Sequence, residues 1–233
     1  MQVRELLWTL ANCPHLARYV KKLGMYFIVV ISAKFTDSNL LELRDFPKNL
    51  TSSEREDLFE LCIRGIANCT SLSSCSWTRD GSLNTVILRT LQQNTHLREL
   101  EINGHHNYYY DPLTLANFTG LRKISLIMPS GDVIKMLPCW LESTGDTLRV
   151  LSLVCKSAAQ VTDTLLSSIA ANLQNLEELH LAGCPKVTHK GVSAILEANN
   201  TRIRALALEG LSASFVSLSY SKTSIALLKY KRI

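Results

Sequence analysis

The chain has 233 residues, of which 46% are apolar and 19% are charged, so it can bury a sizeable core and is not a disordered tail. Its formal net charge of +5 is a modest surplus, and it does not indicate nucleic-acid binding, because such binding needs basic residues concentrated on one face. The seven cysteines are odd in number and include no Cys-x-x-Cys pair. This argues against a disulfide framework and a zinc ribbon, and it favours a reducing compartment, cytoplasmic or nuclear.

The first part of the chain combines a helical pattern at residues 3–10 with a strand-like segment at residues 20–25. Residues 1–13 mix charged and apolar side chains and lack the apolar core of a signal peptide, so export by that route is not expected. The apolar run at residues 23–33 has 11 residues, well short of the roughly 20 that a membrane-spanning helix needs. We interpret it as a buried strand, and we expect no membrane contact.

One hydrophobic pattern, Leu-x-x-Leu-x-Leu with occasional Ile, recurs along the chain. Five copies begin at Leu97, Leu121, Leu148, Leu176 and Ile203. Their starts are 24, 27, 28 and 27 residues apart, which is enough for a strand, a turn, a helix and a return loop. Two weaker copies begin at Leu72 and Val20, and the 52 residues between these two starts hold either two periods or one period with an insertion.

Helical spacing recurs between the strand motifs, for example at residues 161–173. The same spacing predicts helices at residues 53–67, 83–92, 133–141 and 190–197, with Ser53, Asp132 and Thr162 as capping residues. No single unit can cover its own apolar side, so stability must come from stacking, with parallel strands inside and helices outside. The predicted fold class is α/β, a right-handed solenoid of about seven repeats. We expect it to cover residues 1–211, with an insertion or irregular segment at about 26–50 and an irregular cap or tail at 212–233.

The segment LEELHLAGCPKVTHKGVSAIL at residues 176–196 resembles the leucine-rich repeat family, in its cysteine-containing, ribonuclease-inhibitor-like class. In that class a Cys follows the strand, and a Val/Ile-Thr-Asp-x-Gly-Leu turn opens the helix. Cys184 and Val187-Thr188 match this order, whereas His189 replaces the Asp; Cys155 and Val161-Thr162-Asp163 show the same order one repeat earlier. The class is typical of F-box proteins, so the resemblance implies a substrate-recognition domain of an SCF-type ubiquitin ligase adaptor.

An F-box itself is not found in this sequence. Residues 1–10 lack the Leu-Pro opening of an F-box helix, and a strand-like segment follows too soon. We therefore interpret residues 3–10 as the outer helix of a repeat whose strand is missing. A ligase linker subunit is expected as a partner only if an F-box exists outside this chain, and a stand-alone leucine-rich repeat scaffold or inhibitor is the alternative.

The residues that alternate with the pattern leucines are predicted to point into the concave face of the solenoid, because strand side chains alternate with period two. We expect a protein client to bind there, against the candidate residues Glu99, Glu101, Lys123, Ser125, Ser152, Glu178 and His180. Lys123 is the one basic residue among the concave positions, while four glutamates are acidic, so phosphate would be repelled and no nucleic acid is expected. The centre is small and partly apolar, which suits a partner's side chains.

A loop at residues 105–112 concentrates aromatic residues beyond one strand, and Tyr108, Tyr109 and Tyr110 are candidate contacts to the client. The alternative is that the tyrosines fold back and cover a helix that this short repeat cannot supply. Arg98, Arg122, Arg149 and Arg204 recur at one repeat position, interrupted by Glu177. Such a column either contacts the partner or is solvated and paired with glutamates of neighbouring repeats.

Catalysis is not expected. Cys184 lies between His180 and His189 in the sequence, but the three are predicted to belong to the turn, the concave face and the helix start respectively. There is no glycine-rich phosphate loop and no serine-centred elbow. We therefore predict a protein-binding module that has no metal, no cofactor and no enzymatic activity.

Overall fold

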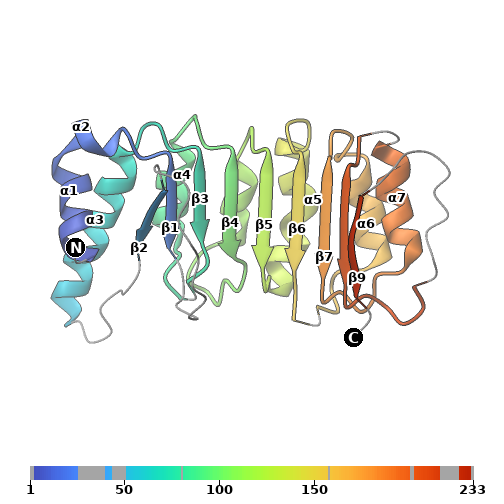
Figure 1. Cartoon of the computed structure of the whole chain (residues 1–233). Helices are drawn as coiled ribbons and strands as arrows, with labels where there is room; N and C mark the ends of the chain where they lie inside the picture. Colours follow the sequence, from blue (N-terminus) through green and yellow to red (C-terminus); the bar gives the residue numbers. More distant parts are fainter. Residues whose placement is uncertain are drawn as a thin grey trace. The chain divides into compact units, whose positions relative to one another are not determined.

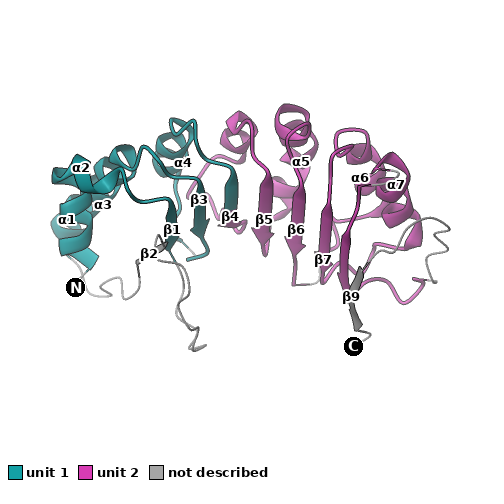
Figure 2. Cartoon of the chain, turned by 45° about the horizontal axis from the view of Figure 1, so that its top comes forward, with its two compact units in different colours: residues 1–100 teal, residues 101–233 magenta. Residues whose placement is uncertain are grey.

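Strands and helices alternate along the chain in the computed structural model, which describes residues 3–25, 40–43, 51–79, 81–156, 158–199, 202–215 and 226–231. The chain divides into two units, Met1–Leu100 and Glu101–Ile233 (Figure 2). Strand β4 (Glu99–Asn103) crosses the division. Among the described helices, none is both long and apolar enough to cross a membrane.

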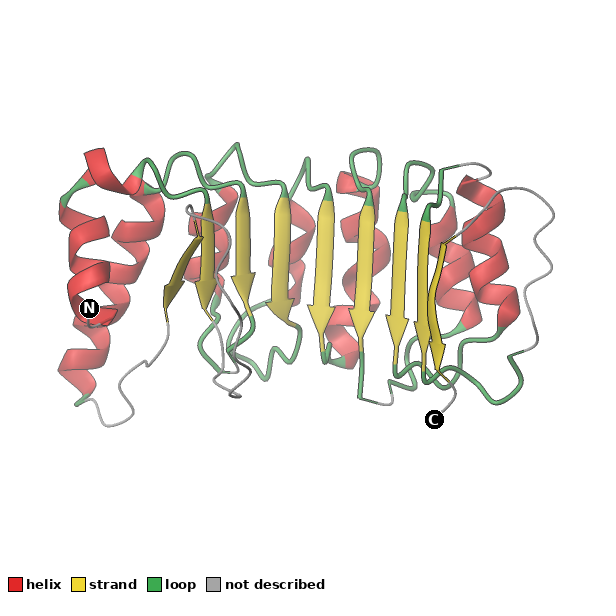
Figure 3. Ribbon diagram, in the orientation of Figure 1, coloured by secondary structure: helices red, strands yellow, loops and turns green. Residues whose placement is uncertain are grey.

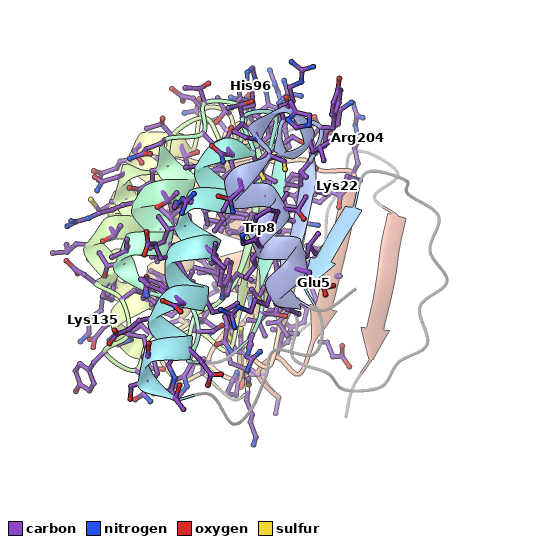
Figure 4. All side chains as sticks on the ribbon, turned by 90° about the vertical axis from the view of Figure 1, so that its left-hand side faces the viewer. Glu5, Trp8, Lys22, His96, Lys135 and Arg204 are labelled. Atoms are coloured by element: carbon purple, nitrogen blue, oxygen red, sulfur yellow. The ribbon has the colours of Figure 1, made fainter. Side chains whose placement is uncertain are left out.

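Unit 1 contains three parallel strands in the order β2-β1-β3, namely β2 (Leu40–Leu43), β1 (Lys22–Met25) and β3 (Ser74–Trp77). Its helices are α1 (Val3–Asn12), α2 (Pro14–Ala17), α3 (Ser52–Asn68) and α4 (Thr85–Gln92). Helix α1 lies beside α3, and the exposed Trp8 is labelled on it in Figure 4. Side chains of β1 and β3 alternate as expected, because Leu23, Met25, Cys75 and Trp77 are buried.

The pairing of β1 with β3 shows whether the 52 residues between their motif starts hold two periods or one period with an insertion. Lys22 lies opposite Ser74, and Met25 opposite Trp77, so the two strands are direct neighbours and one period with an insertion is correct. The insertion contributes β2, which pairs with the opposite side of β1. The apolar run at residues 23–33 is a strand as far as Met25, and its remainder lies outside the described residues.

Unit 2 is a parallel sheet in the order β5-β6-β7-β8-β9 with helices on one face (Figures 1 and 3). The strands are β5 (Lys123–Ile127), β6 (Val150–Val154), β7 (Glu178–Ala182), β8 (Ala205–Glu209) and β9 (Ala226–Lys231). The helices are the 3₁₀ helix η1 (Pro112–Asn117), α5 (Gly131–Thr144), α6 (Asp163–Ala170) and α7 (His189–Asn199).

The pattern leucines form the core between sheet and helices. Leu151 and Leu153 of β6 are fully buried, and they lie in register with Ile124 and Leu126 of β5 and with Leu179 and Leu181 of β7. From the helices, Leu137, Leu166 and Ile195 are also fully buried. The strand–helix period, the parallel register and the buried pattern leucines establish an α/β leucine-rich repeat solenoid fold.

Two of the three predicted capping residues are wrong. Thr162 caps α6, accepting a hydrogen bond from Leu165 N at 3.2 Å. The cap of α3 is Thr51, not Ser53, and the cap of α5 is Ser130, not Asp132. Thr51 forms a capping box with Glu54, and Ser130 Oγ accepts from Val133 N, because a cap needs a short acceptor three residues before the amide that it satisfies.

Two repeats depart from the regular strand–helix pattern. The repeat after β4 has η1 in place of an α-helix, and this is also the repeat with the shortest spacing among the five strong copies, 24 residues. At the other end, residues 226–231 form β9, which pairs with β8 through an irregular register. The segment 212–233, predicted to be an irregular cap or tail, thus adds a strand to the sheet of unit 2; residues 216–225 lie outside the described part.

Candidate functional site

The exposed side of the unit 2 sheet, here called the strand face, consists of the residues that alternate with the buried leucines of β5 to β8. The parallel register arranges them in three rows across the strands. The first row is Lys123, Val150, Glu178 and Ala205; the middle row is Ser125, Ser152, His180 and Ala207; and the end row is Ile127, Val154, Ala182 and Glu209.

The middle row contains the two least exposed side chains of the strand face. Ser125 and Ser152 lie next to each other in register and are only 4% and 7% exposed. Both serines were predicted partner contacts, and the structure leaves little of either side chain exposed to a partner. His180 continues the row on β7 and stays half exposed.

The end row is apolar for three consecutive strands. Val154 is 40% exposed, and its in-register neighbours Ile127 and Ala182 are half buried. Val154 is thus an exposed valine between two further apolar side chains, and Val150 adds another apolar side chain in the first row. This row and the two serines together give a shallow surface of small and apolar groups.

The charged groups flank this surface, Lys123 and Glu178 in the first row and Glu209 at the β8 side of the end row. His180 Nε2 is 3.5 Å from Glu178 Oε2, and Lys123 stands at the start of β5 with a half-buried side chain. Glu209 is exposed at the end of β8. The predicted contacts Lys123, Glu178 and His180 are therefore polar groups beside the apolar row.

The remaining glutamate candidates lie on β4. Glu99 belongs to unit 1, where its Oε2 accepts a hydrogen bond from Ser74 Oγ at 3.1 Å. Glu101 belongs to unit 2 and is half buried. The division between the units runs between these two residues.

Residues 104–111, here called the tyrosine loop, project from the end of β4. Tyr109 N donates to His106 O at 2.7 Å, and Asn107 and Tyr108 have φ of 39° and 63°. Two consecutive left-handed residues define a type I′ turn, a conformation that bulky side chains rarely adopt. Tyr108 at the tip is 92% exposed and Tyr109 is 49% exposed.

Tyr110 does not share this exposure. It is buried, its hydroxyl donates to Asn103 O at 3.4 Å, and its ring meets the His106 ring edge-on with centroids 5.9 Å apart. Burial raises the pKa of the Tyr110 hydroxyl. For Tyr110 the alternative interpretation holds, in which the side chain folds back onto the repeat, because a buried phenol cannot contact a partner directly.

The tyrosine loop is fixed to the start of α5 by His106. His106 Nδ1 is 2.6 Å from Ser130 Oγ, and Nε2 is 3.9 Å from Asp132 Oδ2. Backbone bonds from Gly104 N to Ile127 O and from Ser130 N to Gly104 O hold the base of the loop. A side chain at position 104 would lie 2.6 Å from Pro129 Cα, so Gly is required there. Sequence reasoning missed His106, because nothing in the repeat pattern pairs it with Ser130.

The predicted arginine column is paired in part. Glu177 Oε1 lies 3.6 Å from Arg149 Nε, and its Oε2 lies 3.7 Å from Arg204 Nη1, so one glutamate links two repeats. Arg98 and Arg149 also donate to nearby backbone carbonyls. These contacts favour the interpretation of the column as a paired repeat edge.

The residues considered for catalysis are not brought together. Cys184 is buried in the turn after β7, whereas His180 pairs with Glu178 on the strand face and His189 begins α7. Within the described residues, no group of three or more His, Cys, Asp or Glu side chains is placed to hold a metal ion.

Comparisons with known proteins add little to this geometry. No protein-family model matches the chain, and no curated protein matches its sequence. Among solved structures, an internalin from Listeria monocytogenes is similar, with 16% sequence identity and a TM-score of 0.37. The match covers 68% of this chain and 51% of the internalin chain, so it spans about half of that protein. The leucine-rich repeat assignment therefore rests on the strands, register and core described above.

Proposed function

We propose that unit 2 binds another protein through its strand face and the tip of its tyrosine loop, and that the chain is not an enzyme. The observation that carries the proposal is the exposed apolar row of Ile127, Val154 and Ala182 beside the nearly covered Ser125 and Ser152. This surface, flanked by Lys123, Glu178, His180 and Glu209, combines apolar groups with a polar rim, as protein interfaces do.

The tyrosine loop supports the same proposal. Tyr108 and Tyr109 present large, partly apolar side chains that lose little entropy when a partner covers them. His106 fixes the loop, so the binding conformation of the backbone is already formed before a partner arrives. A strained turn that carries an exposed Tyr at its tip is explained by contact with a partner, whereas stability alone would favour Gly there.

The finer proposal is that the bound protein is a substrate of an SCF-type ubiquitin ligase. Its support is the sequence resemblance alone, carried by Cys155, Cys184 and the Val-Thr turns that precede α6 and α7. The stand-alone scaffold or inhibitor is the competing function. Co-purification of the ligase's linker and cullin subunits with the gene product from its native cells would support the first, and their absence from a client-bound preparation would favour the second.

The binding face is tested by placing a charge in the apolar row. Val154→Glu should weaken a native partner at least tenfold, about 1.4 kcal/mol, because the carboxylate must be desolvated in the interface. Val86→Glu is the matched control, since Val86 is 48% exposed on α4 in unit 1. The partner is first captured from native cells with the wild-type chain and then purified, and its Kd is measured for both variants by calorimetry.

Equal binding by the wild-type chain and Val154→Glu would contradict the proposed strand face. A similar loss with Val86→Glu would also contradict it, because that residue lies on a helix of the other unit. Thermal melts of the two variants should match the wild type, since both positions are exposed.

A further inference from the structure

Two cysteines meet in the turns that follow β6 and β7. The register Val154 opposite Ala182, continued by one residue, places Cys155 opposite Gly183 and next to Cys184. Both cysteines use the same carbonyl: Cys155 N donates to Ala182 O at 2.8 Å, and the Cys184 thiol donates to that oxygen at 3.5 Å. The two thiols therefore lie in adjacent turns, and each affects the pKa of the other.

The two thiols differ in accessibility and acidity. Cys155 is partly exposed, whereas Cys184 is fully buried. Interaction with the Cys184 thiol lowers the pKa of the Cys155 thiol, and the same interaction, together with burial, raises the pKa of Cys184. Cys155 is therefore the nucleophile of the pair, and Cys184 is the thiol held behind it.

The buried thiols of unit 1 show the contrast. Burial raises the pKa of Cys62 to about 12 and that of Cys69 to about 11, and the pKa of Cys75 is raised as well. These three side chains are buried, so they are shielded from solvent and remain protonated at neutral pH. Cys139 is exposed, and it serves as an internal comparison for simple accessibility.

We propose that Cys155 and Cys184 are a peroxide-sensitive thiol pair that forms a disulfide between neighbouring repeats. The Cys155 thiolate attacks hydrogen peroxide, the O–O bond breaks, and the departing hydroxide takes up a proton to leave as water, which leaves Cys155 as a sulfenic acid. The Cys184 thiol gives up its proton and attacks the Cys155 sulfur. The S–O bond breaks, and a second water leaves.

The balance is two thiols and one hydrogen peroxide giving one disulfide and two waters, so the two sulfurs are oxidised and the peroxide is reduced. The bond would tie together the strand ends that carry Val154 and Ala182. A dithiol reductant reverses it by exchange. The inference does not depend on the proposed function, because it concerns the chemistry of the two turns alone.

The test uses the full chain, treated with one equivalent of hydrogen peroxide and then with N-ethylmaleimide, digested with trypsin and analysed by mass spectrometry. Cleavage after Arg149, Lys156 and Lys186 places Cys155 in the peptide 150–156 and Cys184 in the peptide 157–186. We expect these two peptides to be joined in most molecules, and to separate after dithiothreitol, while Cys139 is recovered as its maleimide adduct.

Two variants sharpen the test. In Cys184→Ala, dimedone should trap Cys155 as the sulfenic acid, whereas Cys139→Ala should keep the joined peptides at the wild-type yield. Recovery of peptide 150–156 with unoxidised, alkylated Cys155 would overturn the proposal, and so would a Cys155 disulfide to Cys139 or between two chains. The wild-type peptide map decides the question even if Cys184→Ala does not fold.

Discussion

Asp163 joins two neighbouring repeats through three hydrogen bonds. Its Oδ1 accepts from Thr188 N at 2.8 Å and from Gly191 N at 3.1 Å, and its Oδ2 accepts from Thr188 Oγ1 at 2.6 Å. A side chain at position 191 would lie 2.6 Å from Asp163 Oδ1, so the Gly of the Val-Thr-x-x-Gly turn allows α7 to approach this carboxylate. The recurring Val-Thr turn thus has a physical role as the contact between successive helix starts.

Removing this carboxylate should destabilise the fold. Asp163→Ala leaves the amides of Thr188 and Gly191 without their acceptor and removes negative charge from the start of α7, so we expect a loss of about 2 kcal/mol or more in the free energy of unfolding. Urea unfolding followed by circular dichroism measures it. Asp146→Ala, at an exposed turn position, is the control and should change stability by less than about 0.5 kcal/mol.

The cysteines show how far single residues could be interpreted. The sequence places Cys184 in the turn after its strand, and its burial and its hydrogen bond to Ala182 O agree with that position. The neighbouring position of Cys155 does not follow from the sequence, because 29 residues separate the two and only the strand register brings them together.

At the scale of elements, the tyrosine loop combines a fixed base with an exposed tip. His106, Gly104 and Tyr110 hold the base, whereas Tyr108 and Tyr109 face solvent. The three tyrosines are consecutive in sequence, so the sequence pattern does not show which of them are exposed. The type I′ turn separates them, since it reverses the chain and returns the third ring to the core.

The two exposed tyrosines should therefore affect binding without affecting the fold. Tyr108→Gly combined with Tyr109→Ala is expected to weaken a native partner by roughly 2 kcal/mol or more, because both anchors are lost. Stability should stay within about 0.5 kcal/mol of the wild type, since both side chains are on the surface and Gly suits the left-handed conformation at position 108. Calorimetry measures binding, and a thermal melt measures stability.

Tyr110→Ala is the contrasting variant in the same loop. This substitution should lower the melting temperature, because it removes a buried ring and the hydroxyl that donates to Asn103 O. Intact binding by the Tyr108→Gly, Tyr109→Ala protein would show that the loop tip is not a contact.

At the scale of the molecule, stability comes from stacking repeats on their neighbours. Strand β6 is paired with β5 on one side and with β7 on the other, so its pattern leucines lie beside those of both neighbouring repeats. No repeat buries its own apolar side, and each interface therefore contributes to the stability of the repeats beside it.

A cavity in the middle of this stack should destabilise the adjacent repeats as well as its own. Leu151 is fully buried, and Leu151→Ala is expected to cost about 2 to 5 kcal/mol of unfolding free energy. Amide hydrogen exchange should show faster exchange in β5 and β7 as well as in β6. Val154→Ala, on the exposed side of the same strand, is the control, and wild-type stability of Leu151→Ala would contradict the burial of the pattern leucines.

Most of the solenoid was predictable because its cause is local and repeated. The pattern leucines of β5 to β8 are buried, and the residues that alternate with them are half-buried or exposed, except for Ser125 and Ser152. The predicted helices at 53–67, 133–141 and 161–173 were found, and the cap Thr162 was correct, but the caps of α3 and α5 were not, because Thr51 and Ser130 gain their capping role from exact backbone geometry.

The parts that the sequence left open depend on contacts between residues far apart along the chain. The pairing of β1 with β3, the addition of β2 and β9 to the sheets, the bond between His106 and Ser130, and the meeting of Cys155 with Cys184 all bridge different repeats or insertions. A repeat pattern states which side chains are buried within one unit, since burial follows from local periodicity. It does not state which neighbours a unit meets, because that choice is made by register and packing once the chain has stacked.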